Sequence, residues 1–152
     1  MPTQSPFLSE EMRTQAVGLQ SEPLVLEVEK GAIIRFAQAI EDPNPLWNDE
    51  AAARQSRHGG MIAPPTFLRS APVQRPELPF PVPFEKLLDG GSEWEYFQPV
   101  CAGDRITLST TMESLNERSG RLGAMLFIVY ATEYTNQDGQ QVAIQRNTII
   151  RY

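Results

Sequence analysis

The chain has 152 residues, of which 41% are hydrophobic and 21% are charged, as expected for one globular domain with a buried core. The net charge of −6 argues against nucleic acid or an anionic membrane as main partner, and the single cysteine, Cys101, excludes an intrachain disulfide and a cysteine-rich metal site. No apolar run is long enough to span a membrane and the polar N-terminus does not look like a signal peptide, so we expect one cytoplasmic domain over residues 1–152.

The first thirty residues predict a short helix followed by a strand. Ser9 precedes two glutamates, which is typical of a helix N-cap, and the helix should end near Gly18. Residues 24–28, LVLEV, form an apolar run that favours a strand.

A helix with one buried face is predicted next, ending in a proline-rich turn. Apolar residues recur at helical spacing in this stretch: Ile33, Phe36, Ala37 and Ile40. Pro43 and Pro45 stop the helix just after Asp42, and Asn48 is the expected N-cap of a second short helix. A carboxylate held on a rigid turn between two helices suits acid–base chemistry.

The middle of the chain is rich in proline and predicts little regular structure. Residues 72–83 cannot form a central strand, so we expect an extended surface crossing that Phe80 and Phe84 hold down. Residues 87–91, LLDGG, predict a short turn leading into residues 92–98.

The last third predicts an antiparallel meander of three long strands, over residues 105–115, 122–135 and 142–152. The sequence NQDG at 136–139 is a hairpin signal. The middle strand is apolar on both faces, so it should be covered by a helix of its own chain on one side and by another sheet or subunit on the other. Helices first and a meander last indicate the α+β class.

Two segments carry a family resemblance. FAQAIEDPNPL at 36–46 and GGMIA at 59–63 resemble the MaoC-like hydratases and dehydratases, (R)-specific enzymes that act on enoyl thioesters. The continuation APPTF at 63–67 and the pair Gly103-Asp104 resemble the N-terminal halves of double hot dog dehydratases, akin to the dehydratase region of fungal fatty acid synthase. The resemblance implies a hot dog fold, an antiparallel sheet wrapped around a central helix.

The resemblance also shows where this chain departs from catalytic members. Those subunits use an aspartate, a histidine five residues later and a glycine N–H that stabilises the charge developing on the thioester oxygen. Asp42 matches the aspartate, but Trp47 occupies the histidine position and Pro64-Pro65 replaces the His-Gly pair. Proline has no N–H, so Pro65 cannot be the oxyanion donor. The only histidine, His58, aligns ahead of the glycine hinge.

Asp42 is therefore the one candidate catalytic residue, and we favour a structural role for it. The residues that the resemblance implies near substrate are Trp47, Gly60, Ile62, Pro64, Pro65 and Thr66. Three of them also have a plainer interpretation. Trp47 could fill the space of the missing histidine, Gly60 could be a backbone hinge, and Thr66 could be a helix N-cap after the prolines.

The resemblance implies a non-catalytic subunit that accommodates the acyl chain of a CoA or acyl-carrier-protein thioester, beside a catalytic hot dog partner in an enoyl-thioester hydratase or 3-hydroxyacyl-thioester dehydratase. It implies no metal or redox cofactor. Two alternatives stay open: a self-sufficient homodimeric hydratase that uses Asp42, and an acyl-CoA binding module without turnover.

Overall fold

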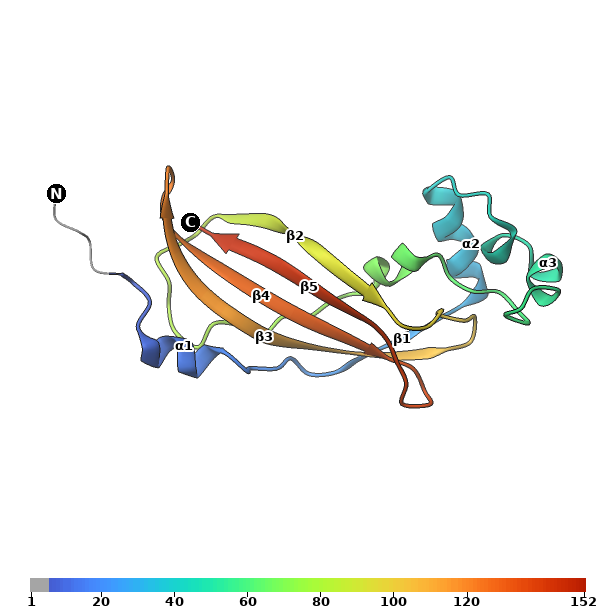
Figure 1. Cartoon of the computed structure of the whole chain (residues 1–152), viewed down its shortest axis with the longest axis horizontal. Helices are drawn as coiled ribbons and strands as arrows, with labels where there is room; N and C mark the ends of the chain where they lie inside the picture. The colour runs from blue at the N-terminus through green and yellow to red at the C-terminus, as the bar shows by residue number, and fades with distance from the viewer. Residues whose placement is uncertain (1–5) are drawn as a thin grey trace.

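The computed structural model describes residues 6–152, which form a five-stranded antiparallel sheet with short helices near its two ends (Figure 1). The strands are β1 (Leu24–Glu27), β2 (Leu87–Tyr96), β3 (Arg105–Gly120), β4 (Gly123–Thr135) and β5 (Gln141–Arg151). Their order across the sheet is β1-β3-β4-β5-β2, so β1 and β2 are the edge strands. The expected α+β class and the β3-β4-β5 meander are confirmed.

The turn between β4 and β5 forms where the hairpin signal predicts it. The side-chain oxygen of Asn136 accepts hydrogen bonds from the backbone N–H groups of Asp138 and Gln140, both at 3.0 Å. Gly139 has a φ of +74°, a backbone conformation that favours glycine. The local sequence is therefore sufficient to define this hairpin.

The N-terminal helices also agree with expectation, with one exception. Helix α1 (Glu10–Ala16) is capped by the Ser9 side chain, which accepts from the N–H of Met12. Helix α2 (Lys30–Ala39) buries Ile33 and Ala37. Ile40 was expected on the same buried face but is 44% exposed, because the helix has already ended there and Ile40 is its C-cap. The short helix α3 (Glu50–Arg54) follows.

A short 3-10 helix crosses the inner face of the sheet in place of the long central helix that was expected. At the position expected for that helix, the structure places the 3-10 helix η2 (Pro65–Ser70), followed by extended chain through residues 71–86. Prolines that recur from position 64 to position 83 remove helical N–H donors and restrict each preceding residue, so a long helix cannot form. Phe84 is buried and Phe80 is half-buried against the sheet, as predicted.

The predicted turn at residues 87–91 is wrong, because β2 already begins at Leu87. The pairing of β2 with β5 shifts register between Asp89 and Ser92, which marks a β-bulge. Gly91 has a φ of +107°, and a Cβ on Gly90 would lie 3.0 Å from the carbonyl oxygen of Thr148. A bulge needs the same glycines as a turn, so the sequence DGG did not distinguish the two.

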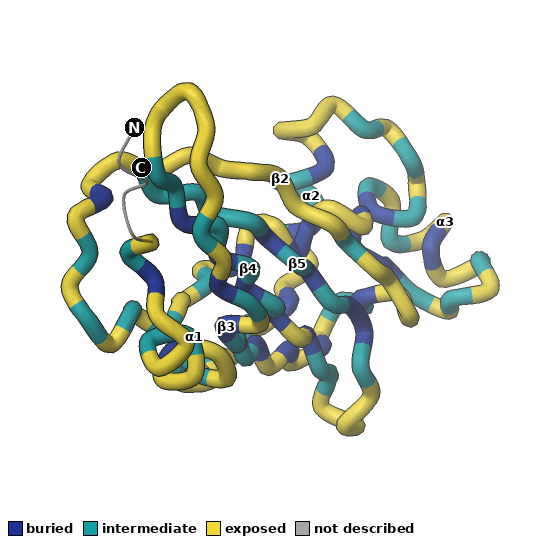
Figure 2. The backbone as a smooth tube through the Cα atoms, turned by 60° about the vertical axis from the view of Figure 1, so that its left-hand side comes forward, coloured by how far each residue is buried: buried dark blue, intermediate teal, exposed yellow. Residues whose placement is uncertain are grey.

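The central strand β4 is covered on one face by its own chain. Leu126, Ile128 and Tyr130 are buried beneath α1 and the extended segment 78–84. On the opposite face Phe127 and Val129 remain half-buried, and β2 is exposed along most of its length (Figure 2). The second cover, another sheet or subunit, stays a prediction. Within residues 6–152, no helix has the length and hydropathy needed to cross a membrane.

Candidate functional site

Asp42 lies in a tightly bonded turn at the end of α2. Its backbone N–H donates to the carbonyl of Ala37 at 3.0 Å, and Glu41 before it has a φ of +55°, so the helix ends in a Schellman-type turn without glycine. The Asp42 carboxylate accepts from the N–H of Asn44 at 3.0 Å. Asn44 in turn accepts from the N–H of Leu46 at 3.0 Å. The Asp42 side chain therefore stabilises this turn.

The side chain of Asn48 also stabilises this turn. Its side-chain amide donates to the carbonyls of Asp42 and Asn44, at 2.7 and 2.8 Å. The prediction that Asn48 is the N-cap of the next helix is wrong, because Asn48 is the C-cap of the 3-10 helix η1 (Pro45–Trp47) and the N-cap of α3 falls one residue later. Asp49 accepts from the N–H of Ala52 at 3.1 Å and is the N-cap of α3.

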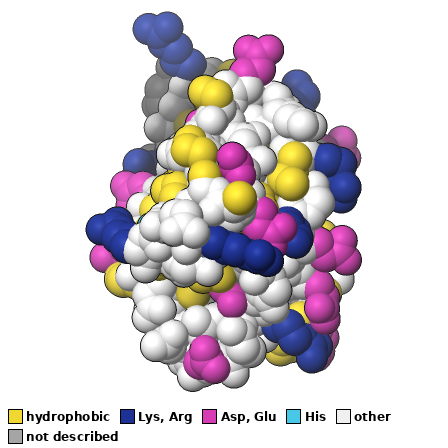
Figure 3. Space-filling model, turned by 90° about the vertical axis from the view of Figure 1, so that its right-hand side faces the viewer, with side chains coloured by type: hydrophobic (Ala, Val, Ile, Leu, Met, Phe, Trp, Pro, Cys, Tyr) yellow, Lys and Arg dark blue, Asp and Glu magenta, His cyan; other side chains and the backbone are white. Residues whose placement is uncertain are grey.

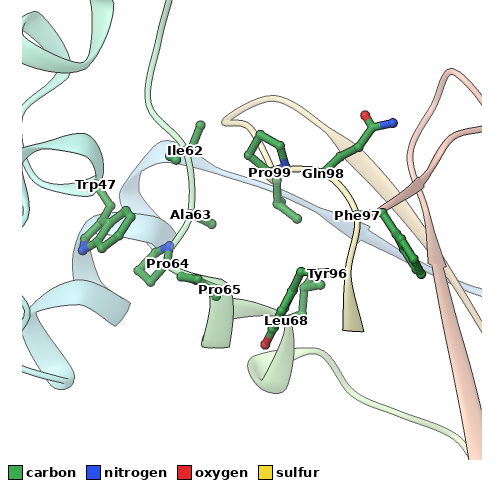
Figure 4. Close-up of a pocket in the computed structure, with 11 residues that line it drawn as sticks. Trp47, Ile62, Ala63, Pro64, Pro65, Leu68, Tyr96, Phe97, Gln98 and Pro99 are labelled. Carbon is green, nitrogen blue, oxygen red and sulfur yellow. The ribbon is translucent and has the colours of Figure 1, made fainter. Parts of the chain in front are cut away.

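A pocket of about 310 Å³ lies beside this turn. It is formed by three pieces of chain: Trp47 from η1, residues 62–68, and residues 96–100 at the end of β2 (Figure 4). Four of the six residues expected near substrate line it, namely Trp47, Ile62, Pro64 and Pro65. Gly60 and Thr66 are not among its lining residues.

Thr66 is also not the helix cap that its plainer interpretation predicted. The N-cap of η2 is Pro64, with no side-chain hydrogen bond, and Thr66 is an exposed residue inside the helix. Phe67 donates its N–H to the Pro64 carbonyl at 2.9 Å. The two prolines, whose φ is already fixed near the helical value, begin this helix without a polar cap.

The pocket wall is held by backbone pairing between two distant segments. The N–H of Ala63 donates to the carbonyl of Val100 at 2.7 Å, and the N–H of Ala102 donates to the carbonyl of Met61 at 3.0 Å. Asp104 is buried, and its carboxylate accepts from the N–H of Cys101 at 2.8 Å. The Gly103-Asp104 pair therefore shapes the turn that carries one side of the pocket.

Sequence reasoning missed the side of the pocket formed by residues 96–100. Tyr96 stacks on Trp94 with ring centroids 5.7 Å apart, and Trp94 in turn lies 5.5 Å from Tyr134. Trp94 is half-buried against the core, whereas Tyr96 and Phe97 are more than 40% exposed. The signal that could have found them is the presence of large apolar side chains at the end of an edge strand.

The pocket is almost wholly apolar. Among the described residues 6–152, Tyr96 is the only ionisable one in its lining, and burial raises the pKa of the Tyr96 phenol. Asp42 and His58 are outside the lining. The nearby Cys101 thiol also has a raised pKa, caused by burial and then by the charge of Asp104. The lining therefore offers apolar contact but no group that exchanges a proton near pH 7.

Trp47 is the residue that the family resemblance aligns with the histidine of catalytic members. The side chain is 9% exposed, and its indole Nε1 is buried without a hydrogen-bond partner among the described residues. Figure 4 shows that this nitrogen is turned away from residues 96–99. The indole therefore presents carbon atoms to the pocket.

Acidic and basic side chains are interspersed over the outer surface of the end that carries α2 and α3 (Figure 3).

The antiparallel sheet and this apolar site fit a hot dog protein. The model of the FAS1-like dehydratase domain region matches residues 15–145, so the chain belongs to that family. A UPF0336 protein of Streptomyces avermitilis is 36% identical over 101 residues, which are 62% of this chain and 66% of that protein. A probable enoyl-CoA hydratase alpha subunit of Thermomonospora curvata is 30% identical over 139 residues, covering 79% of this chain and 43% of its own length.

Solved structures establish the fold. The ChsH1-ChsH2 complex of Mycobacterium tuberculosis contains a chain that matches with a TM-score of 0.75 at 20% identity, covering 93% of this chain and 87% of that one. A chain of the HadBC (3R-hydroxyacyl-ACP dehydratase) complex from the same organism matches with a TM-score of 0.70 at 22% identity, covering 91% of this chain and 98% of that one. A MaoC-like dehydratase from Rhodospirillum rubrum matches with a TM-score of 0.68 at 24% identity, covering 90% of this chain and 92% of that one. The expected hot dog fold is confirmed.

Proposed function

We propose that this chain is the non-catalytic subunit of an enoyl-thioester hydratase or 3-hydroxyacyl-thioester dehydratase, and that its pocket accommodates part of the acyl thioester. The observation that carries the proposal is the chemistry of the pocket. Every lining residue except Tyr96 and Gln98 is apolar, and the phenol of Tyr96 stays protonated near neutral pH. Such a surface favours an acyl chain and cannot activate water.

The positions of the missing catalytic groups support the same conclusion. A general base and an oxyanion donor are the two features that hydration of an enoyl thioester needs. Asp42 is bonded within its turn, Trp47 supplies no base, and Pro65 has no N–H. Removing one oxyanion donor typically costs about a hundredfold to a thousandfold in rate. A partner must then supply the base and the donor.

The free edge of the sheet supports a hot dog partner. β2 is an edge strand, and four large apolar residues along it or just beyond it are exposed: Leu87, Leu88, Tyr96 and Phe97. An edge strand leaves backbone N–H and C=O groups unpaired, so a partner sheet could continue this one. Two of the structural neighbours come from complexes that carry two subunit names, ChsH1-ChsH2 and HadBC.

The test is to purify the chain alone and together with a hot dog subunit that carries the intact Asp-x-x-x-x-His and His-Gly pattern. We expect the chain alone not to hydrate crotonyl-CoA above the uncatalysed rate. We expect the complex to hydrate a bulky enoyl-CoA faster than the catalytic subunit alone. Turnover by the purified homodimer that is lost in Asp42→Asn would favour the self-sufficient hydratase instead. Tight acyl-CoA binding with no turnover beside any partner would favour a binding module.

A further inference from the structure

A second cavity, of about 600 Å³, opens on the inner face of the sheet and shares no lining residue with the first. Its floor is formed by Ile128 and Tyr130 of β4 and by Ile149 of β5. The extended segment 75–82 forms its wall. The volume falls within the range of roughly 300–1,000 Å³ that is usual for pockets that bind small molecules.

Two arginines line this cavity beside its apolar floor. The guanidinium of Arg75 donates to the side-chain oxygen of Asn147 at 2.8 Å and lies 5.5 Å from the centre of the Tyr130 ring. Arg151 pairs in register with Leu126, which places it on the inner face. Its Nε is buried with no hydrogen-bond partner, and neither arginine forms an ion pair with a carboxylate within residues 6–152.

The charges of both arginines act on Tyr130. Burial raises the pKa of its phenol, and the nearby charges of Arg75 and Arg151 each act in the opposite direction. The phenol is protonated at neutral pH and is therefore a hydrogen-bond donor. Within residues 6–152, no protein group is hydrogen-bonded to the Tyr130 hydroxyl. The cavity thus combines an apolar floor with donors that have no acceptor.

The charge balance around the cavity favours an anion. Glu77 also lines it, and Asp89 is connected to Arg75 through the side chain of Asn147. The Asp89 carboxylate already accepts from Gly91 and Asn147, at 2.9 and 3.1 Å. The lining itself therefore carries two positive charges and one negative charge, in a chain whose net charge is −6.

We propose that this cavity binds a small apolar molecule that ends in a single carboxylate. The apolar body lies on Ile128 and Ile149, and the carboxylate is paired with Arg151 and the Tyr130 hydroxyl. Guanidinium groups bind carboxylates through charge-assisted hydrogen bonds, and Arg151 is part of the cavity lining. This site does not depend on the proposed subunit function.

The experiment is a calorimetric titration of the full chain with decanoate and with decanol at neutral pH. We expect decanoate to bind at least about tenfold more tightly than decanol. Arg151→Met should remove this preference, while Arg151→Lys retains part of it. The matched control is Arg118→Met, because Arg118 is exposed on the opposite face of the sheet, 4.7 Å from the Phe127 ring. Both Met variants remove one positive charge.

Equal affinity for decanoate and decanol in the unsubstituted chain would overturn the proposal, and so would an equal loss in Arg151→Met and Arg118→Met. Tryptophan fluorescence locates the ligand, because both tryptophans of the chain lie at the first pocket. Trp47 lines this pocket, and Trp94 stacks on its lining residue Tyr96. Decanoate should leave that fluorescence unchanged. A fluorescence change that saturates with the dissociation constant measured by calorimetry would place decanoate in the first pocket and contradict the assignment.

Discussion

The side-chain amide of Asn48 donates to the backbone carbonyl of Asp42 at 2.7 Å, while the Asp42 carboxylate accepts from the N–H of Asn44. These bonds give Asp42 a structural role that an asparagine can also perform, because its side-chain oxygen can accept the same hydrogen bond. We expect Asp42→Asn to change the free energy of unfolding by less than about 0.5 kcal/mol, and Asp42→Ala to lower it by about 1 kcal/mol. Urea denaturation measures both. Loss of hydration activity in a folded Asp42→Asn complex would show instead that the carboxylate takes part in chemistry.

Trp47 contributes buried apolar area, whereas its indole N–H is unpaired. Trp47→Phe removes the unpaired donor and keeps an aromatic ring, so the free energy of unfolding should change by less than about 1.5 kcal/mol. Trp47→Ala leaves a cavity and should cost about 3–5 kcal/mol. Chemical denaturation of the two variants checks this. An equal loss of free energy of unfolding in the two variants would mean that the indole N–H of Trp47 has a hydrogen-bond partner in solution.

Asp89 should make stability sensitive to acid. Hydrogen bonds from Gly91 and then Asn147 hold the pKa of its carboxyl below the usual 3.8. A carboxyl whose pKa is lower in the folded state stabilises the fold above its unfolded pKa, and that stabilisation disappears as the pH falls through the folded pKa. Asp89→Asn should therefore lose less stability than the unsubstituted chain between pH 7 and pH 3.

The matched control for Asp89 is Asp138→Asn, since Asp138 is exposed in the β4–β5 turn and its carboxylate accepts no hydrogen bond within residues 6–152. It should behave like the unsubstituted chain in thermal denaturation at each pH. An unchanged pH dependence in Asp89→Asn would show that the carboxylate at the bulge has no role in acid stability.

The exposed end of β2 should be where a partner attaches. Phe97 is 47% exposed there, so Phe97→Asp should leave the subunit folded and weaken its association with a catalytic partner by at least about tenfold. Leu122→Asp is the control, because Leu122 is 58% exposed at the β3–β4 turn, away from this end of β2. Sedimentation velocity measures both. Equal affinities for the two variants would place the interface elsewhere.

The parts of the fold that local chemistry decides could be predicted from the sequence. Alternating apolar residues and the turn at 136–139 define the β3-β4-β5 meander, and Ser9 marks the start of α1. The start of β2 could not be predicted, because a glycine-rich bulge and a glycine-rich turn use the same residues. The central helix was expected from the resemblance although the prolines that prevent it were visible in the sequence.

The site could be predicted only where it is continuous in sequence. Trp47, Ile62, Pro64 and Pro65 come from one segment that the resemblance covers, and the structure brings them together. Residues 96–100 join them only because the loop after β2 pairs with residues 61–63, as in the bond from Ala63 to Val100. No local pattern indicates such a long-range contact. The second cavity depends in the same way on the proline-rich segment folding back over β4 and β5.

We propose that this chain contributes binding surface but no catalytic group. The most direct measurement is the rate of crotonyl-CoA hydration by the purified chain alone, compared with an equal concentration of its complex with a catalytic hot dog subunit. We expect the rate for the chain alone to equal the uncatalysed rate, and hydration to occur only in the complex. Steady hydration by the chain alone, proportional to its concentration, would contradict it.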